Sequence, residues 1–329
     1  MARLFGSHSL THQVLIQKGT TFSDRPEIYP LRAISTASYG PTWRAFRHNL
    51  ASNFLRPSNV KSYSWARKYV LGVMIAHIQE QQEAVGTIKL PEDSKLTQTE
   101  MVSMCSEFLV GGTEATSNAL QWIMANLVKH PCIQSKLYVE IVAVVGPPPP
   151  PPPPGVDHEL ELVITEENLQ KIPYLKAVIL EGLRRHPPGH IVLPHRVTEE
   201  VELQGYKIPK GATINFMVAE MGWDPEVWDD PMEFKPERFL MNDGSGVGFD
   251  VGGSKGIKMM PFGAGRRICP GADLALLHLE YFVANLIWYF HWTVPDGYTV
   301  DLTEQAKFTV VMKNPLKTKI FSRTKTTTA

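Results

Sequence analysis

The feature that most constrains this chain is a glycine-rich segment that presents one cysteine immediately before an apolar helical pattern. The segment runs from Pro261 to Gly271, contains Cys269, and leads into a helix predicted to begin near Ala272. Backbone N–H groups and the partial positive charge at a helix N-terminus favour a thiolate, which is the form that binds metal. A buried structural cysteine is the ordinary alternative. The glycines, arginines and proline around Cys269 favour the metal ligand instead.

Composition excludes several other classes of protein. The chain has 329 residues, 33 Lys+Arg against 33 Asp+Glu, 43% hydrophobic and 20% charged residues. These values argue against a disordered polyelectrolyte and against a strongly basic nucleic-acid surface, so we expect no nucleic-acid partner. Only three cysteines are present and none lies in a CxxC pair, which favours a reduced compartment over a disulfide scaffold.

Hydrophobic periodicity predicts a mainly α fold with small β-sheets (α+β) in a single domain over 1–329. The predicted helices cover about 10–15, a segment from Pro41, 63–82, 97–129, 173–185 and the apolar stretch 274–292, and the predicted strands cover 201–203, 206–208 and 213–216. His278, Glu280, Asn285 and His291 interrupt the apolar stretch, so we interpret it as a core helix rather than a membrane span. The first residues contain no apolar run of signal-peptide or membrane-spanning length.

Eight consecutive prolines, Pro147–Pro154, interrupt the chain. Such a run forms polyproline II and cannot belong to a packed core. An expanded surface loop is the favoured interpretation. A docking site for a proline-binding module is the alternative, although no flanking arginine gives the run an orientation.

The cysteine segment resembles the haem-binding loop of the cytochrome P450 family, Phe-x-x-Gly-x-Arg-x-Cys-x-Gly. All five fixed positions are matched, by Phe262, Gly265, Arg267, Cys269 and Gly271. The resemblance implies a haem-thiolate enzyme in which Cys269 is the iron ligand of haem b (iron protoporphyrin IX). A thiolate ligand pushes electron density onto the iron and favours O–O cleavage.

Other marks of the family follow in the expected order. Glu181 and Arg184, with Arg238 in a Pro-Glu-Arg-Phe segment, resemble the buried Glu–Arg–Arg network that supports the haem scaffold in this family. We assign these three residues a structural role. Trp43 and Arg47, four residues apart on one helical face, resemble a pair that meets a haem propionate.

Two further side chains are implied to bind the propionates. His195 lies at the strand position from which relatives offer a donor, and Arg267 lies two residues before the cysteine. For each side chain alone, a solvated surface role is the ordinary interpretation. Arg47, His195 and Arg267 together, combined with Cys269, favour cofactor binding.

The long helical pattern resembles the distal helix of the family over Gly111–Thr116. Gly112 would open a groove for dioxygen, and Glu114 stands at the position of the proton-relay acid. The alcohol position is Ala115, whose side chain can neither donate nor accept a hydrogen bond. Thr116 is the neighbouring candidate for a catalytic role, but it is about 100° further around the helix. We therefore predict poor coupling of electron flow to product. Glycines within a helix also predict that another group approaches the backbone closely.

The chain is also short for this family. The stretch between Arg47 and Gly111 leaves no room for the several helices that normally roof the substrate cavity. We also expect the membrane anchor and the first sheet strands of relatives, which would lie upstream of Met1, to be absent. An open haem site holds an apolar substrate poorly and admits water. We therefore expect a P450-like fold that lacks the anchor and much of the helical roof.

The resemblance to plant microsomal members implies a monooxygenase that hydroxylates a hydrophobic small molecule. It implies electrons from NADPH through a flavin-containing reductase, and a location at the endoplasmic reticulum membrane. Without an anchor, the chain as written would be cytosolic or peripheral. Two alternatives remain: a catalytically inactive haem-binding or interaction protein derived from the same family, and a helical domain in which Cys269 is buried and no haem binds.

Overall fold

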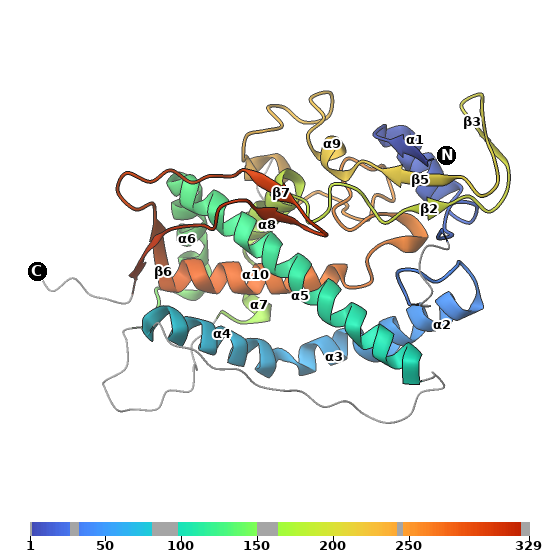
Figure 1. The fold of residues 1–329 in the computed structure, drawn as a ribbon. Coiled ribbons are helices and arrows are strands. Elements are labelled where there is room, and N and C mark those ends of the chain that lie inside the picture. Colours follow the sequence, from blue (N-terminus) through green and yellow to red (C-terminus); the bar gives the residue numbers. More distant parts are fainter. Residues whose placement is uncertain (1, 27–32, 81–97, 150–163, 242–245, 324–329) are drawn as a thin grey trace, which may run out of the picture.

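A long apolar helix, α10 (Ala272–Tyr289), lies at the centre of the fold in the computed structural model (Figure 1). The structure describes residues 2–26, 33–80, 98–149, 164–241 and 246–323. Helices α5 (Gln98–Lys129), α6 (Pro131–Val145), α7 (Glu166–Leu169) and α8 (Pro173–Arg185) all contact α10. The predicted core helix is therefore confirmed.

The polar residues of α10 are accommodated by hydrogen bonds inside the core. Asn285 is fully buried, donates to Tyr281 O at 2.8 Å and accepts from Ile164 N at 3.0 Å. Buried polar groups cost little when they are paired in this way. Within the part of the chain that the structure describes, no helix combines the length and apolar character needed to cross a membrane.

Glycine allows the two helices α5 and α8 to approach closely. A Cβ atom at Gly182 would lie 2.4 Å from Cγ1 of Ile123, a residue of α5 that is completely buried. Any larger residue at 182 would push the two helices apart. Pro131 and Pro173 begin α6 and α8, at the first helical turn where a missing N–H has no cost.

The N-terminal part contributes a strand that the sequence analysis did not predict. Strand β1 (Ala2–Phe5) pairs in parallel with β5 (Thr213–Phe216), which pairs antiparallel with β2 (His195–Arg196). A strand of four residues is too short to show a hydrophobic periodicity in the sequence. Strand β1 is recognised only from its pairing with β5. The predicted helix near residues 10–15 is present as α1 (His8–His12) and the π-helical turn Gln13–Gln17.

Four helical segments follow, and one of them corrects a prediction. They are α2 (Pro41–Asn49), the π-helical turn Leu50–Phe54, α3 (Pro57–Ser62) and α4 (Ser64–Glu80). The helical spacing of apolar residues in 63–82, with Trp65 and Tyr69 among them, predicts that one face of this helix packs on the rest of the fold. That prediction is wrong, because Trp65 is 67% exposed and Tyr69 is 68% exposed. Leu71, fully buried, makes the core contact of α4 instead.

Small two-stranded sheets complete the fold, as expected for the α+β class. They are β3 (Val201–Leu203) with β4 (Tyr206–Ile208), β7 (Glu304–Ala306) with β8 (Val310–Met312), and β6 (Phe290–Thr293) with the C-terminal β9 (Lys319–Ser322). Strands β3, β4 and β5 coincide with the predicted ones. A short helix, α9 (Val218–Gly222), follows β5.

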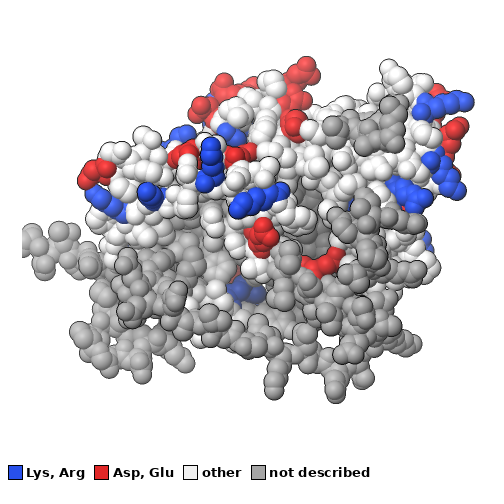
Figure 2. All heavy atoms as spheres, in the orientation of Figure 1, with Lys and Arg blue, Asp and Glu red and all other residues white. Residues whose placement is uncertain are grey.

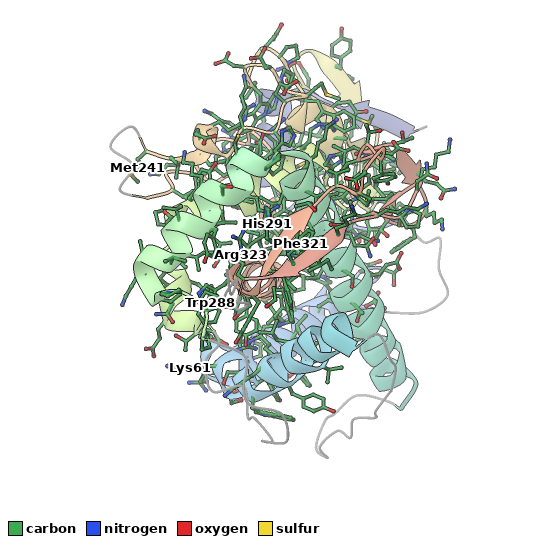
Figure 3. All side chains as sticks on the ribbon, turned by 90° about the vertical axis from the view of Figure 1, so that its left-hand side faces the viewer. Lys61, Met241, Trp288, His291, Phe321 and Arg323 are labelled. Atoms are coloured by element: carbon green, nitrogen blue, oxygen red, sulfur yellow. The ribbon has the colours of Figure 1, made fainter. Side chains whose placement is uncertain are left out.

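Strand β9 ends against the C-terminus of α10 (Figure 3). Arg323 Nε donates to Ile287 O at 3.0 Å and to Phe290 O at 3.1 Å, and its guanidinium lies 3.7 Å from the centre of the Tyr138 ring. Cations near a helix C-terminus interact favourably with its carbonyl groups. Arg323 therefore joins β9 to both α10 and α6.

The proline run begins directly after α6. Gly146 ends that helix with a positive φ of 81°, and residues 147–149 are neither helix nor strand. The rest of Pro147–Pro154 lies outside the described residues. On the face drawn in Figure 2, Lys and Arg side chains are interspersed with Asp and Glu, so that face carries both signs of charge.

The buried carboxyl of Glu280 in α10 makes a testable contribution to stability. Burial raises its pKa to about 7, against the opposing effect of Lys176. The unfolded chain ionises at lower pH than the folded chain, so the unfolded state is favoured progressively as pH rises from about 4.5 to 7. Glu280→Gln should therefore be more stable than the parent by on the order of 2 kcal/mol at pH 8, and by little at pH 4.5.

Urea unfolding at a series of pH values measures this difference. Glu202→Gln, at an exposed position of β3, is the matched control. If Glu280→Gln raised the free energy of unfolding by the same amount at pH 4.5 and at pH 8, the raised pKa assigned to Glu280 would be wrong.

Candidate functional site

The cysteine segment folds into a tight loop that packs on the N-terminal part of the chain. The N–H of Cys269 donates to Phe262 O at 2.8 Å, which closes the loop. Gly265 has a positive φ of 68°, and a Cβ atom there would lie 2.1 Å from Leu15 O. Only glycine fits this position, because both the backbone conformation and the space exclude a side chain.

The thiol of Cys269 reaches solvent at the mouth of this loop. The Gly271 N–H bonds to its sulfur, and both this bond and the charge of Arg47 lower the thiol pKa, but burial has the larger effect and raises it. The N–H at the helix N-terminus thus acts in the predicted direction, and the larger effect of burial opposes it. A bound cation would reverse the balance, since a coordinating thiol is deprotonated.

Arg47 and Trp43 of α2 lie beside the cysteine loop. Arg47 Nη1 donates to Ile268 O at 2.6 Å, one residue before the cysteine. The guanidinium of Arg267 lies 4.6 Å from the centre of the Trp43 ring, and Trp43 is 7% exposed. The structure thus brings these predicted residues of α2 against the loop.

Arg25 is a member of this site that the sequence analysis missed. The residues Ser23-Asp24-Arg25-Pro26 predict an exposed turn, whereas Arg25 is 8% exposed and Ser23 is 3% exposed. Burial and the neighbouring charge of Arg267 lower the pKa of Arg25 to about 9, and Asp24 opposes them. No local pattern marks Arg25, because its burial comes from β2 and from the cysteine loop.

The two arginines hold one short loop in place. Arg267 donates through Nε to Ser23 O at 2.7 Å and through Nη2 to Ala37 O at 2.7 Å. Arg25 donates through Nε to Ser35 O at 2.9 Å and through Nη1 to Leu193 O at 2.7 Å. Loop 33–37 is therefore fixed above the cysteine segment.

Loop 33–37 is also tied to α5. A carboxylate oxygen of Glu107 accepts from Ile34 N at 2.9 Å, and the carbonyl of Ile34 accepts from Arg267 Nη1 at 3.3 Å. Gly112 is five residues further along α5, about 7.5 Å along the helix axis. Glu107 of α5 and Arg267 of the cysteine loop therefore both bind Ile34, and this connects the predicted distal segment of α5 to the cysteine loop.

His195 lies deep beneath the cationic group. It is 4% exposed, its Nδ1 donates to Phe22 O at 2.7 Å, and its ring packs edge-on to Phe216 at 5.3 Å. Burial and the charges of Arg25 and Arg267 lower its pKa to about 3. His195 is therefore neutral, and because Nδ1 donates to Phe22 O, its Nε2 can only accept a hydrogen bond. In this tautomer His195 offers no N–H at Nε2 to a propionate carboxylate, so the structure does not support its predicted role as a propionate donor.

The donor set fits a dianionic haem. Arg267 interacts electrostatically with Arg25 and with Arg47, and Arg47 interacts with Cys269. The carboxylate that raises the pKa of both Arg25 and Arg267 is Asp24. Burial and like charge lower the pKa of Arg267 to about 10, although Asp24 and Tyr39 raise it. Buried cations that repel one another are stabilised by bound carboxylates. Two propionates and a thiolate-bound iron would supply that compensation.

The predicted network of Glu181, Arg184 and Arg238 is present beneath this region. Arg184 binds the Glu181 carboxylate through two bonds of 2.7 and 2.8 Å, and Arg238 Nε donates to it at 3.2 Å. Glu181 is fully buried and Arg184 is 1% exposed. Arg184 also donates to Gly222 O and Pro231 O, which joins α8 to the irregular segment after α9.

The candidate distal residues lie on one stretch of α5. A Cβ atom at Gly111 or Gly112 would meet no atom within 4 Å, so among the described residues no group approaches these glycines closely, contrary to prediction. Glu114 accepts a hydrogen bond from Thr309 Oγ1 at 2.7 Å. Ala115 and Thr116 are partly exposed. Sequence reasoning missed Thr309, which lies far from Glu114 along the chain.

Comparisons with known proteins show which family this chain resembles. Residues 86–320 match the family model described as "Cytochrome P450". Cytochrome P450 89A9 of Arabidopsis thaliana is 37% identical over 436 residues, covering 96% of this chain and 83% of that protein. Beta-amyrin 24-hydroxylase of Glycine max is 38% identical, covering 68% of this chain and 42% of that protein.

A solved structure shows the same fold. A zebrafish cytochrome P450 with progesterone superposes with a TM-score of 0.78 at 18% identity, covering 98% of this chain and 93% of that one. The alignment of 436 residues with the first relative exceeds the 329 residues of this chain. That relative therefore contains residues with no counterpart here.

Proposed function

The chain belongs to the cytochrome P450 family, whose members are haem-thiolate monooxygenases, and we propose that it binds haem b through Cys269 and hydroxylates a hydrophobic small molecule. The observation that carries this proposal is the cationic group of Arg25, which is buried, with Arg47 and Arg267, which are partly buried, beside a loop that closes around one cysteine. A thiolate and two carboxylates are what this arrangement would hold.

When bound, the haem supplies oxygen activation at its iron. The residues of this chain position it: Cys269 as the iron ligand, Phe262, Gly265 and Gly271 as the shape of the loop, and Trp43 as the support of Arg267. Arg25, Arg47 and Arg267 would orient its propionates, whereas the neutral His195 packs beneath these arginines and donates to Phe22 O. Gly112 leaves space on α5, and Glu114 would hold a proton for delivery.

Members of this family generally receive electrons from an NADPH-dependent reductase and act on hydrophobic substrates. We propose a flavin-containing NADPH reductase as the partner of this chain. Plant members are typically microsomal, and we propose the endoplasmic reticulum membrane as its location. A proline-binding module at Pro147–Pro154 remains a proposal for a further partner.

Two measurements separate these proposals from an inactive haem-binding protein. Reconstitution with haemin should give a thiolate-type Soret band in the reduced, carbon-monoxide-bound spectrum. Addition of NADPH and the reductase should then give NADPH oxidation and, with a panel of hydrophobic compounds, hydroxylated product. A thiolate band without any product from the panel or NADPH oxidation would support the inactive alternative, which the absence of a hydroxyl at Ala115 favours.

The hydroxyl missing at Ala115 gives a direct prediction. Ala115→Thr should lower the hydrogen peroxide released per NADPH about two-fold, because a helix hydroxyl can hold a water that delivers protons. Ser117→Ala is the matched control on α5, since the Ser117 hydroxyl bonds to Thr113 O at 2.5 Å on the exposed face. Equal peroxide yields from Ala115→Thr and the parent would mean that proton delivery does not depend on this position.

A further inference from the structure

A hydroxyl group from outside α5 contacts the acid that α5 presents. Thr309, in the turn between β7 and β8, donates through Oγ1 to Glu114 Oε1 at 2.7 Å. The same Oγ1 accepts from Asn118 Nδ2 at 2.8 Å. An amide NH₂ group only donates, so the hydroxyl hydrogen is directed to the carboxylate. The two hydrogen bonds therefore run in one direction: Asn118 donates to Thr309, and Thr309 donates to Glu114.

The position of this hydroxyl is fixed by its surroundings. Thr309 is 7% exposed and Asn118 is 8% exposed. The next residue, Val310, accepts from Trp122 Nε1 at 3.1 Å and donates through its N–H to Pro188 O at 2.8 Å. The turn is thus held against both α5 and the segment after α8. Thr309 therefore loses little conformational entropy when it forms its hydrogen bond to Glu114.

The contact falls on the helix face that carries the candidate proton relay. Glu114 and Asn118 are four residues apart and share a face of α5. Ala115, one residue further, contributes no hydroxyl, and Thr116 lies still further around the helix. Among the described side chains, the hydroxyl with a hydrogen bond to Glu114 comes from the β7–β8 turn rather than from α5.

We propose that Thr309 is a positioning residue for Glu114, supplying from the β7–β8 turn an alcohol in place of the one that Ala115 lacks. It holds the Glu114 carboxylate in a single orientation, from which that group passes protons toward the haem. This assignment rests on the proposed function.

A double-mutant cycle tests the contact without reference to turnover. Thermal unfolding midpoints are measured for Thr309→Val, Glu114→Ala and the double variant. Each single change should lower the midpoint, and the double change should lower it clearly less than the two shifts added. Thr309→Ser keeps the hydroxyl and should match the parent. Thr303→Val is the matched control, because the Thr303 hydroxyl binds Asp301 at the surface of the same hairpin.

Reductase-supported NADPH oxidation by the haem-loaded chain tests the role. Thr309→Val should lower its rate at least about three-fold and Thr309→Ser should restore it, whereas Thr303→Val should have the parent rate. In the Glu114→Ala background, Thr309→Val should have no further effect, a result that general loss of structure would not give.

Three outcomes are decisive. Additive midpoint shifts, or an equal rate loss in both backgrounds, would overturn the assignment of Thr309 while leaving the haem proposal intact. A parent chain that folds but shows no thiolate band would overturn the proposed function itself. Non-additive midpoint shifts, together with a rate loss on Thr309→Val that occurs only when Glu114 is present, would support the assignment.

Discussion

Replacement of Cys269 by serine is expected to abolish the thiolate-type Soret band of the reduced, carbon-monoxide-bound protein. A serine hydroxyl remains protonated at neutral pH and cannot replace the thiolate as an electron-donating ligand. The loop should keep its shape, because the Cys269 N–H that bonds to Phe262 O belongs to the backbone. Circular dichroism should therefore show unchanged helical content.

Cys132→Ser is the matched control for this experiment. Cys132 is also exposed, but it lies at the start of α6, away from the arginine group. Its replacement should leave the spectrum as in the parent. Survival of the thiolate band in Cys269→Ser would identify another cysteine as the ligand.

The second large effect concerns stability. Glu181→Gln should lower the free energy of unfolding by about 3–5 kcal/mol, because removing one partner of a buried ion pair leaves uncompensated charge. Arg184 is 1% exposed and Arg238 contacts the same carboxylate, so both guanidinium groups lose their counterion. Lys235 N–H also loses a charged acceptor, at 2.7 Å in the parent.

Urea unfolding followed by tryptophan fluorescence measures this loss. Asp296→Asn is the matched control, since the Lys319–Asp296 pair is exposed and surface pairs contribute little. Its expected effect is much smaller than that of Glu181→Gln, because solvent screens an exposed pair. A comparably small loss in Glu181→Gln would show that the network does not hold the scaffold.

Local patterns in the sequence predicted the elements that have strong local signals. Helices α5, α8 and α10 are long and apolar, and β3 and β4 alternate around a Gln204-Gly205 turn in which both residues have positive φ. The Glu181 pair with Arg184 is local to one helix. These features depend mainly on residues near one another in sequence, which periodicity and motif spacing can read.

Features that depend on distant segments escaped prediction. Burial of Arg25 requires carbonyl groups from Ser35 and Leu193, and the Thr309 contact requires the β7–β8 turn to fold onto α5. The exposed face of α4 shows the reverse error: an apolar stripe predicts a buried face only when another element covers it. The direction of the Cys269 pKa shift also depends on how far the thiol is buried, which no motif reports.

The most direct test of the account is the reduced, carbon-monoxide-bound spectrum of the chain itself after reconstitution with haemin. We predict a thiolate-type Soret band from a folded preparation, with about one haem bound per chain. A well-folded sample that remains colourless, or that binds haem without the thiolate-type band, would contradict the assignment of Cys269 as the iron ligand.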